Sequence, residues 1–260
     1  MTKKKIMFFD IDGTLIGFNN HGKMTPKMIS ALHQLKAKGI YIGLATGRQT
    51  TVYERIFKEL TPLDFVIGSN GREVVIHNQT IYRDEITKET IEKLIRYDNQ
   101  YHVGLLLSSN YGSATYNPPI EKCAYYLQQL ALPTPQQDKD FYLNQTILQA
   151  MIYCDEQTEQ MFQKAFPELN FIRHNHDGID VVTSGPLKER GIDEVLQYYG
   201  LTKADALAFG DGLNDVGMFQ HIDGVCLGVA HPELKKYAIK QIDTVENDGI
   251  YTFLKDENYI

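Results

Sequence analysis

The chain has 260 residues, of which 43% are hydrophobic and 23% charged, and its formal net charge is −7. This composition is typical of an ordinary soluble globular protein with a sizeable core, built as one large domain or two small ones. The acidic balance argues against nucleic acid as a general partner, because phosphate backbones select basic surfaces. No stretch approaches the roughly 18–20 apolar residues that span a bilayer, so we expect no membrane partner.

The start of the chain and its cysteines predict a cytoplasmic protein. Asp10 interrupts the apolar run that follows three lysines after only four residues, so a signal-peptide hydrophobic region is not expected. Cys123, Cys154 and Cys226 are far apart, odd in number and outside any Cys-x-x-Cys motif. Reduced thiols in the cytoplasm are the simplest account of that pattern.

The first predicted element is a buried strand over Ile6 to Phe9, which runs into Asp10-Ile11-Asp12-Gly13-Thr14. Side chains two residues apart point to the same side of a strand, so Asp10 and Asp12 should face together. At the carboxyl end of a central strand, that side is the ligand crevice of an open α/β sheet. Two crowded carboxylates repel each other unless a cation or a shared proton intervenes. The alternative is a strand that stops at a solvated Asp-Gly turn.

A helix and a second strand follow and complete a βαβ unit. Thr25 to Lys38 predicts an amphipathic helix, with Thr25 as N-cap and Pro26 at the first helical position. Ile40 to Ala45 predicts a strand that ends in Thr46-Gly47-Arg48, where Thr46 either binds a ligand or caps the next helix. The expected elements that follow are a helix over Gln49 to Glu59, a strand over Phe65 to Gly68, and a hairpin of Glu73 to His77 with Thr80 to Arg83 around Asn78-Gln79.

From about Asp84 to Thr183 the pattern changes to helices mixed with hairpin strands, which predicts an α+β module on a sheet. The expected helices are Thr87 to Asn99, Ile120 to Leu130 and Glu156 to Phe166. The expected strands are Val103 to Ser108, Ile147 to Cys154, and a hairpin of Asn170 to His174 with Ile179 to Val182; Pro133 to Asp140 is expected to be a loop.

After residue 184 the chain returns to alternating strands and helices. Lys188 opens an amphipathic stretch that ends at Tyr199, although it could also be one of many solvated lysines. Ala206 to Phe209 predicts an apolar strand that runs into Gly210-Asp211-Gly212-Leu213-Asn214-Asp215, which could also be a polar turn before a helix. Another strand is expected near Val225 to Gly228. We therefore infer an α/β fold, with a Rossmann-like parallel-sheet core from residues 1–83 and 184–260 and an α+β cap inserted at 84–183.

Four segments together resemble the motifs of the haloacid dehalogenase superfamily, and in detail its Cof-like branch of small-metabolite phosphatases with a class IIB cap. Asp10 to Thr14 is similar to the first motif, Ala45 to Arg48 to the second, Lys188 to the third, and Gly210 to Asp215 to the fourth. Asn70-Gly71 and Asn247-Asp248-Gly249-Ile250 also fit this branch. The resemblance implies a Mg²⁺-dependent phosphatase that acts through an aspartyl-phosphate intermediate.

The resemblance also implies a role for each matching residue. Asp10 would be the nucleophile, and Asp12 would protonate the leaving group and then activate water. Mg²⁺ would be held by the Asp10 carboxylate, the Asp12 backbone carbonyl and Asp211, with Asp215 in the outer shell or bound through water. Asn214 would orient Lys188 or the phosphoryl group. The residues expected around the phosphoryl group are Gly13, Thr46, Gly47, Arg48, Lys188 and Asn214.

The cap is expected to close over the leaving group and to choose the substrate, a small phosphorylated metabolite such as a sugar phosphate or a phosphorylated cofactor. The candidate cap contacts are Arg173, His174, Asn175, His176, Asp177 and the turn Asn110-Tyr111-Gly112. Residues 174–177 could also form a metal cluster, but a solvated turn is the simpler account because a structural site needs about four well-placed ligands.

Two other functions and the assembly state remain open at the level of sequence. A phosphotransferase or phosphomutase of the same superfamily would need a cap that protects the aspartyl-phosphate, and the sequence has no obvious cationic cluster for it. A non-catalytic regulator that binds phosphorylated metabolites would be favoured by loss of Asp10 or Asp12, and both are present. We expect a monomer or a weak homo-oligomer.

Overall fold

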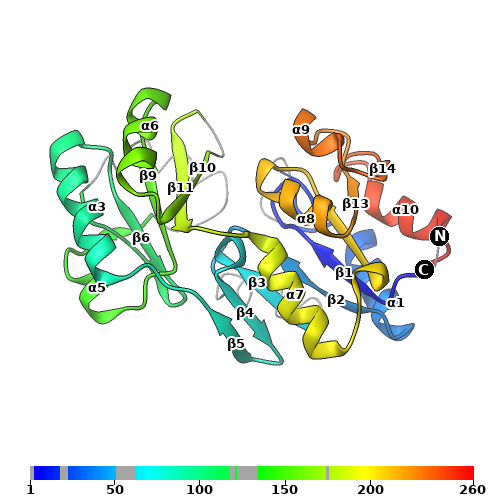
Figure 1. Ribbon diagram of the computed structural model, residues 1–260. Helices are drawn as coiled ribbons and strands as arrows, with labels where there is room; N and C mark the ends of the chain where they lie inside the picture. Colours follow the sequence, from blue (N-terminus) through cyan, green and yellow to red (C-terminus); the bar gives the residue numbers. More distant parts are fainter. Residues whose placement is uncertain (1–2, 18–22, 51–62, 118–120, 122–133, 174–175) are drawn as a thin grey trace. The chain divides into compact units, whose positions relative to one another are not determined.

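The computed structural model describes residues 3–17, 23–50, 63–117, 121, 134–173 and 176–260. The chain forms two compact units: the first combines Met1–Tyr82 with Pro186–Ile260, and the second is Arg83–Gly185. The first unit is therefore assembled from both parts of the chain that flank the second (Figure 1).

The first unit contains a sheet with the strand order β14-β13-β12-β1-β2-β3-β4-β5. Neighbouring strands from β14 to β3 are parallel, and β4 is antiparallel to β3. Phe9 at the end of β1 pairs with Phe209 in β12 and Leu44 in β2, so these three strands end at the same edge. The bounds are β1 (Ile6–Phe9), β2 (Tyr41–Ala45), β3 (Phe65–Gly68), β4 (Glu73–Ile76), β5 (Gln79–Arg83), β12 (Ala206–Gly210), β13 (Asp223–Cys226) and β14 (Lys240–Gln241).

Helices cover both faces of this sheet, which explains why its central strands are apolar along their whole length. Met7 and Phe9 pack with α1 (Pro26–Ala37) and α10 (Gly249–Asp256) in one cluster. Ile6 and Phe8 point to the other face and pack with α7, α8 and α9. The bounds are α7 (Lys188–Tyr199), α8 (Val216–His221) and α9 (Pro232–Lys235), with short 3-10 turns η1 (Ser69–Gly71), η2 (Lys203–Asp205) and η3 (Leu213–Asp215).

Helix α1 begins as its sequence predicts. The Thr25 hydroxyl accepts a hydrogen bond from the Met28 amide at 3.2 Å, and Pro26 takes the first helical position. The Thr25 cap satisfies one of the amides that have no partner within the helix. The buried face of α1 is Met28, Ala31, Leu32 and Leu35, whose spacing of three and four residues is that of an amphipathic helix.

The second unit contains a sheet with the order β10-β11-β9-β6-β7-β8, in which the pairs are antiparallel except for β7 with β8. Helices α3 (Lys88–Tyr101) and α6 (Glu156–Ala165) contribute to its apolar core, together with alternate residues of the central strands. The remaining bounds are β6 (Leu106–Ser109), β7 (Gly112–Thr115), β8 (Gln136–Gln137), α5 (Phe141–Asn144), β9 (Gln149–Tyr153), β10 (Leu169–Arg173) and β11 (Gly178–Thr183).

The elements confirm the predicted α/β class and differ from the prediction in detail. The β4–β5 turn is His77-Asn78, one residue earlier than expected, because both residues adopt the positive φ that a tight hairpin requires. Strand β8 lies within the predicted loop 133–140, and β7 begins at Gly112, the last residue of the predicted turn 110–112. The helices predicted over 49–59 and 120–130 lie almost wholly outside the described residues. None of the helices in the described part of the chain has the length and the apolar run that crossing a membrane requires.

Candidate active site

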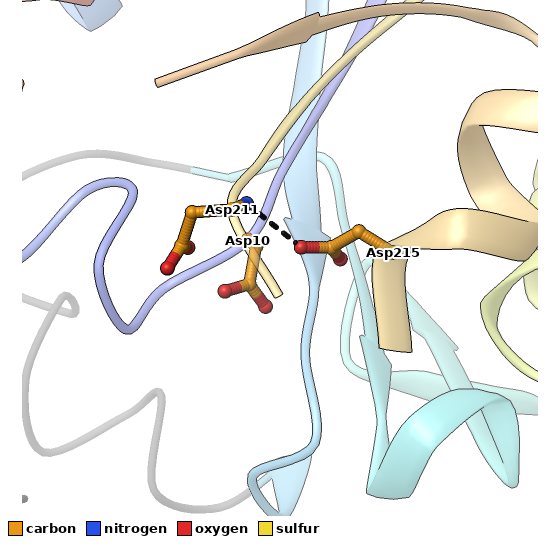
Figure 2. A group of neighbouring side chains, drawn as sticks. All are labelled: Asp10, Asp211 and Asp215. Atoms are coloured by element: carbon orange, nitrogen blue, oxygen red, sulfur yellow. Dashed lines mark hydrogen bonds between the residues drawn. The ribbon is translucent and has the colours of Figure 1, made fainter. Parts of the chain in front are cut away.

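Three aspartates from separate segments meet at the carboxyl edge of the first unit's sheet. Asp10 follows β1, Asp211 follows β12, and Asp215 is the last residue of η3. Carboxylate oxygens of these three residues all lie within 4.8 Å of one another (Figure 2). The Asp10 amide donates to the Phe209 carbonyl at 3.0 Å, which extends the β1–β12 pairing by one residue and holds Asp10 beside the next strand.

Lys188 provides the positive charge of this group. Its side chain is fully buried at the first turn of α7, and Nζ donates to Asp10 Oδ1 at 2.7 Å and to Asp215 Oδ1 at 2.6 Å. Burial alone would lower the pKa of Lys188, but the two carboxylates raise it above its usual value. Lys188 is therefore a charged side chain inside the site and not a solvated surface lysine.

The aspartates lie in a site that favours a further cation. Burial raises the pKa of the Asp10 carboxyl well above its usual value; Lys188 opposes this shift, while Asp215 and Asp211 add to it. Burial, and then the charge of Asp215, raise the pKa of Asp211 to about 7. Three carboxylates face one ammonium, which leaves two negative charges when all are ionised. A divalent cation with a preference for oxygen ligands, such as Mg²⁺, fits this donor set.

Asp215 also shapes the turn that carries Asp211. Its Oδ2 accepts hydrogen bonds from the backbone amides of Asp211 and Gly212, both at 3.0 Å, while Oδ1 accepts from Lys188. A Cβ at Gly210 would lie 2.5 Å from Asp215 Oδ2, so this close turn needs glycine there. Both Asp215 oxygens thus accept hydrogen bonds within the protein.

The loop after β1 supports Asp211 from the opposite side. The Thr14 hydroxyl donates to Asp211 Oδ1 at 2.7 Å. Gly13 has a φ of +78°, and a Cβ there would lie 2.1 Å from Asp211 Oδ2. Only glycine allows the chain to turn here while Asp211 stays in place.

Asp12 does not join the group of three carboxylates. Arg48 holds it in a two-point ion pair, with Nε 2.7 Å from Oδ2 and Nη2 2.5 Å from Oδ1. The strand ends at Phe9, so the two-residue alternation that would align Asp12 with Asp10 does not extend to Asp12. The structure therefore places the Arg48 guanidinium on Asp12, and the predicted contact of Arg48 with a phosphoryl group stays a prediction.

The segment after β2 brings the remaining predicted phosphate contacts to the same edge. Thr46 is buried and its hydroxyl accepts from the Arg48 amide at 3.1 Å, a local turn contact. Asn214 Nδ2 donates to Asn70 Oδ1 at 3.1 Å, whereas the described partners of Lys188 are aspartates. Asn70 lies at this edge as well, and the sequence assigned it no role.

Some of the residues predicted to contact the substrate from the second unit lie within the described part of the chain, and others do not. Arg173 makes contacts within that unit: Nε donates to Glu159 Oε2 at 2.8 Å and Nη2 to the Cys154 carbonyl at 3.0 Å. His176 is exposed and lies 3.0 Å from Asp177 Oδ1, and Tyr111 is 80% exposed at the β6–β7 turn. His174 and Asn175 lie outside the described residues. Within the described ranges, Asp10, Asp211 and Asp215 form the one group of three or more side chains with metal-binding geometry.

The family model for the haloacid dehalogenase-like hydrolases matches residues 7–254. The chain therefore belongs to the haloacid dehalogenase-like hydrolase family. Its resemblance to the Cof-like, subclass IIB members is confirmed, and it is an enzyme of the phosphatase type within that family.

The similar proteins cover nearly the whole chain. The putative phosphatase YkrA of Bacillus subtilis is 32% identical over 97% of this chain and 97% of its own length. An HMP-PP phosphatase of Yersinia pseudotuberculosis is 26% identical over 96% of this chain and 94% of its own. The solved structure of the HAD subclass IIB sugar phosphatase BT4131 has a TM-score of 0.87 and 26% identity, with 98% of this chain and 100% of that chain covered.

Proposed function

We propose that the protein is a Mg²⁺-dependent phosphatase of small phosphorylated metabolites that acts through an aspartyl-phosphate on Asp10. One observation carries the proposal: a fully buried Lys188 bridges Asp10 and Asp215 beside Asp211, at the carboxyl edge of a parallel sheet. A permanent positive charge beside a carboxylate in a site with spare negative charge suits the transfer of an anionic phosphoryl group.

Asp10 is the proposed nucleophile. Lys188 donates to its Oδ1, and in the described residues no hydrogen-bond donor contacts Oδ2, so we assign the attack on phosphorus to Oδ2. The ester oxygen leaves as the bond from Oδ2 to phosphorus forms, and Asp10 becomes an acyl phosphate. Lys188 stabilises the carboxylate form of Asp10 before attack and the charge of the phosphoryl oxygens during it.

The residues that would hold Mg²⁺ are Asp10 and Asp211, together with the Asp12 backbone carbonyl that the family resemblance implies. The ion, when bound, supplies charge neutralisation for the phosphoryl oxygens and for the buried carboxylates. Asp215 supports the site indirectly, since its two oxygens accept from Lys188 and from the amides of the 211–212 turn. Thr14 orients Asp211 through its hydroxyl.

Asp12 is the proposed acid and base. It gives a proton to the leaving oxygen and then takes one from the water that attacks phosphorus and releases Asp10. Both Asp12 oxygens accept from Arg48, so proton transfer requires at least one of these two hydrogen bonds to open. Between the two steps, the two-point contact with Arg48 orients the Asp12 carboxylate.

The phosphoryl oxygens are assigned to donors at the same edge. Thr46, the Gly47 amide, Lys188 and Asn214 lie on segments that follow β2, begin α7 and follow β12. Gly13 lets the chain pass beside Asp211 without a side chain in the way. Small phosphorylated metabolites are the proposed substrates because the named relatives include a sugar phosphatase and an HMP-PP phosphatase. The second unit is the proposed cap, and the cytoplasmic location and monomeric or weakly oligomeric state stay predictions.

The test is Mg²⁺-dependent release of phosphate from a panel of sugar phosphates, phosphorylated cofactors and p-nitrophenyl phosphate, with Asp10→Asn as the matched variant. We expect Asp10→Asn to keep the fold and to lower turnover by several orders of magnitude, roughly 10³-fold or more. Trapping of a radiolabelled acyl phosphate on the wild type should fail on the variant. Near-normal turnover by Asp10→Asn would exclude Asp10 as the nucleophile. Transfer of the phosphoryl group to a sugar rather than to water would favour the phosphomutase alternative.

A further inference from the structure

The turn η1, which follows β3, has an unusual backbone. Ser69, Asn70 and Gly71 have φ angles of 50°, 52° and 93°, all in the positive range. Positive φ is uncommon for residues other than glycine, and asparagine tolerates it best. All three residues are buried, so contacts with their surroundings hold them in this conformation.

The backbone of this turn is hydrogen-bonded to the segment that follows β2. The Ser69 amide donates to the Arg48 carbonyl at 2.8 Å, and the Asn70 amide donates to the Thr46 carbonyl at 3.0 Å. The two bonds bracket Gly47, whose amide is a proposed phosphate donor. The position of Gly47 is therefore fixed by the turn as well as by the sheet.

The Asn70 side chain lies between two proposed phosphate contacts. Its Oδ1 accepts from Asn214 Nδ2 at 3.1 Å. A Cβ on Gly47 would lie 3.1 Å from the same oxygen and 3.2 Å from Asn70 Nδ2. The fully buried Asn70 amide thus fills the space beside Gly47 and orients the amide of Asn214.

Gly71 brings the turn against a third segment of the site. A Cβ at Gly71 would lie 2.1 Å from the Leu187 carbonyl oxygen and 3.1 Å from the Lys188 amide. The turn therefore packs directly on the backbone where α7 begins and where Lys188 enters the site. One three-residue turn contacts the segments that carry Gly47, Lys188 and Asn214.

We propose that Asn70 is a positioning residue for phosphoryl binding: its amide fixes Asn214 relative to Gly47 without touching the substrate. The inference rests on the proposed function, since it assigns Gly47 and Asn214 to the phosphoryl group. It predicts that Asn70 acts on phosphate affinity through Asn214. A residue with a purely structural role would change the unfolding temperature and leave affinity per folded molecule unchanged.

The first test is Asn70→Gly, because glycine tolerates the left-handed turn while the side chain with its amide is removed. Loss of a group that orients a metal ligand typically costs about 10- to 100-fold, and we expect a rise of similar size in KM for p-nitrophenyl phosphate and in Kd for orthovanadate. Asn78→Gly is the matched control, since Asn78 is exposed and has a φ of 64° in the β4–β5 turn. Its KM and Kd should equal those of the wild type. Unchanged constants in Asn70→Gly would overturn the proposal.

A double variant tests whether Asn70 acts through Asn214. If it does, Asn70→Gly combined with Asn214→Ala should bind orthovanadate no more weakly than Asn214→Ala alone. Multiplied losses in the double variant would show that the two side chains act independently, and the proposed link would be wrong.

Asn70→Asp keeps the proposal testable if Asn70→Gly folds poorly. Aspartate also tolerates positive φ and keeps the accepting oxygen, but it would place a negative charge beside the bound anion. We expect orthovanadate Kd to rise in Asn70→Asp and to stay at the wild-type value in the control Asn78→Asp. An equal Kd for Asn70→Asp and the wild type would show that Asn70 does not lie beside the phosphoryl contacts, and the proposal would be overturned.

The same measurements separate the inference from the proposed function. Turnover by the wild type with unchanged constants in the Asn70 variants would overturn the inference alone. A wild type that binds orthovanadate tightly but hydrolyses no ester would overturn the phosphatase proposal, and the Kd values would still decide the role of Asn70. A wild type that neither hydrolyses esters nor binds orthovanadate would overturn both.

Discussion

The two units of the chain place their polar groups in different parts of their sheets. In the first unit, apolar side chains of the central strands face helices on both sides, as Met7 and Phe8 do. In the second unit, Leu107 and Ala150 face a core shared with α3 and α6. The adjacent, paired residues Ser108 and Gln149 must point to the opposite face because side chains alternate along a strand.

This difference decides where each unit can carry chemistry. A parallel sheet covered on both faces has room for charged groups only at its strand ends, where Asp10 and Asp211 lie. The outer face of the second unit's sheet is mixed, with Ser108 and Gln149 next to a small apolar cluster of Leu106, Met151 and Tyr153.

The largest predicted effect is the loss of the buried ammonium in the first unit. Lys188→Met should abolish turnover, by roughly 10³-fold or more, because the charge beside Asp10 disappears. Leaving Asp10 and Asp215 buried without their partner should lower the free energy of unfolding at neutral pH by about 3–5 kcal/mol. Urea unfolding monitored with phosphate release measures both quantities.

Lys5→Met is the matched control for this variant. Lys5 is 63% exposed and pairs with Asp205, so its removal should cost less than about 1 kcal/mol and leave turnover intact. The loss in Lys188→Met should shrink at acid pH, because burial raises the pKa of Asp10 and favours its neutral form there. A loss independent of pH would show that packing, and not charge, makes Lys188 important.

The second prediction concerns the aromatic core of the second unit. Phe162 is fully buried and packs against Phe166 and Tyr97 with ring centroids 5.9 Å and 5.5 Å away. Phe162→Ala should lower stability by about 3–5 kcal/mol. Hydrogen exchange should then rise within residues 83–185 and stay unchanged in the strands β1, β2 and β12.

Phe253→Ala is the opposite experiment, because Phe253 is buried in the first unit and its ring lies 5.6 Å from that of Phe209. It should raise exchange in residues 1–82 and 186–260 and leave the second unit protected. Equal effects of both variants throughout the chain would contradict the comparison and indicate a single cooperative unit.

The sequence predicted those features of the two units that follow from the pattern of apolar residues along the chain. The apolar strands β1, β2 and β12 were identified, and because parallel strands end at one edge, the meeting of Asp10 and Asp211 could be inferred. The short strand β7 was missed because Gly112 and Ser113 have low strand propensity and are held by pairing with β6.

Contacts between distant segments could not be predicted from pattern. The Arg48–Asp12 pair forms where the strands have already ended, so no periodicity describes it. Asn70 and Asn214 are 144 residues apart, and their contact depends on the left-handed turn after β3. Both features follow from how loops pack at the sheet edge, which alternation of apolar residues does not encode.

The third prediction concerns how the stability of the first unit depends on pH, because its buried carboxylates lie close together. Burial and Asp215 raise the pKa of Asp211 from 3.8 to about 7, so the folded protein binds this proton more tightly than the unfolded chain. The contribution of Asp211 to the stability of the metal-free protein should therefore fall as pH rises from about 4 to about 7 and stay constant above. The loss should reach at most about 4 kcal/mol, since a tenfold change in proton affinity is worth about 1.4 kcal/mol.

Thermal unfolding at pH 5, 6, 7 and 8, with EDTA or with Mg²⁺, measures this dependence. Asp211→Asn should flatten the slope, because the neutral amide has no proton to lose. Mg²⁺ should restore stability at pH 8, since a ligand that binds only the folded protein stabilises it. A metal-free wild type that gains no stability on Asp211 protonation, so that its pH dependence equals that of Asp211→Asn, would contradict the raised pKa of Asp211.

The smallest predicted effect concerns the Arg48–Asp12 pair, which also decides between two roles of Arg48. Lysine cannot make the two-point contact, so Arg48→Lys should misorient Asp12 and lower kcat by about tenfold. If Arg48 acts only through Asp12, orthovanadate Kd should stay unchanged, and Arg48→Lys should add nothing in an Asp12→Asn background. If Arg48 also binds the phosphoryl group, as the sequence predicts, Kd should rise in both backgrounds. Arg190→Lys is the control, because Arg190 is 49% exposed and pairs with Glu194, four residues further along the same helix.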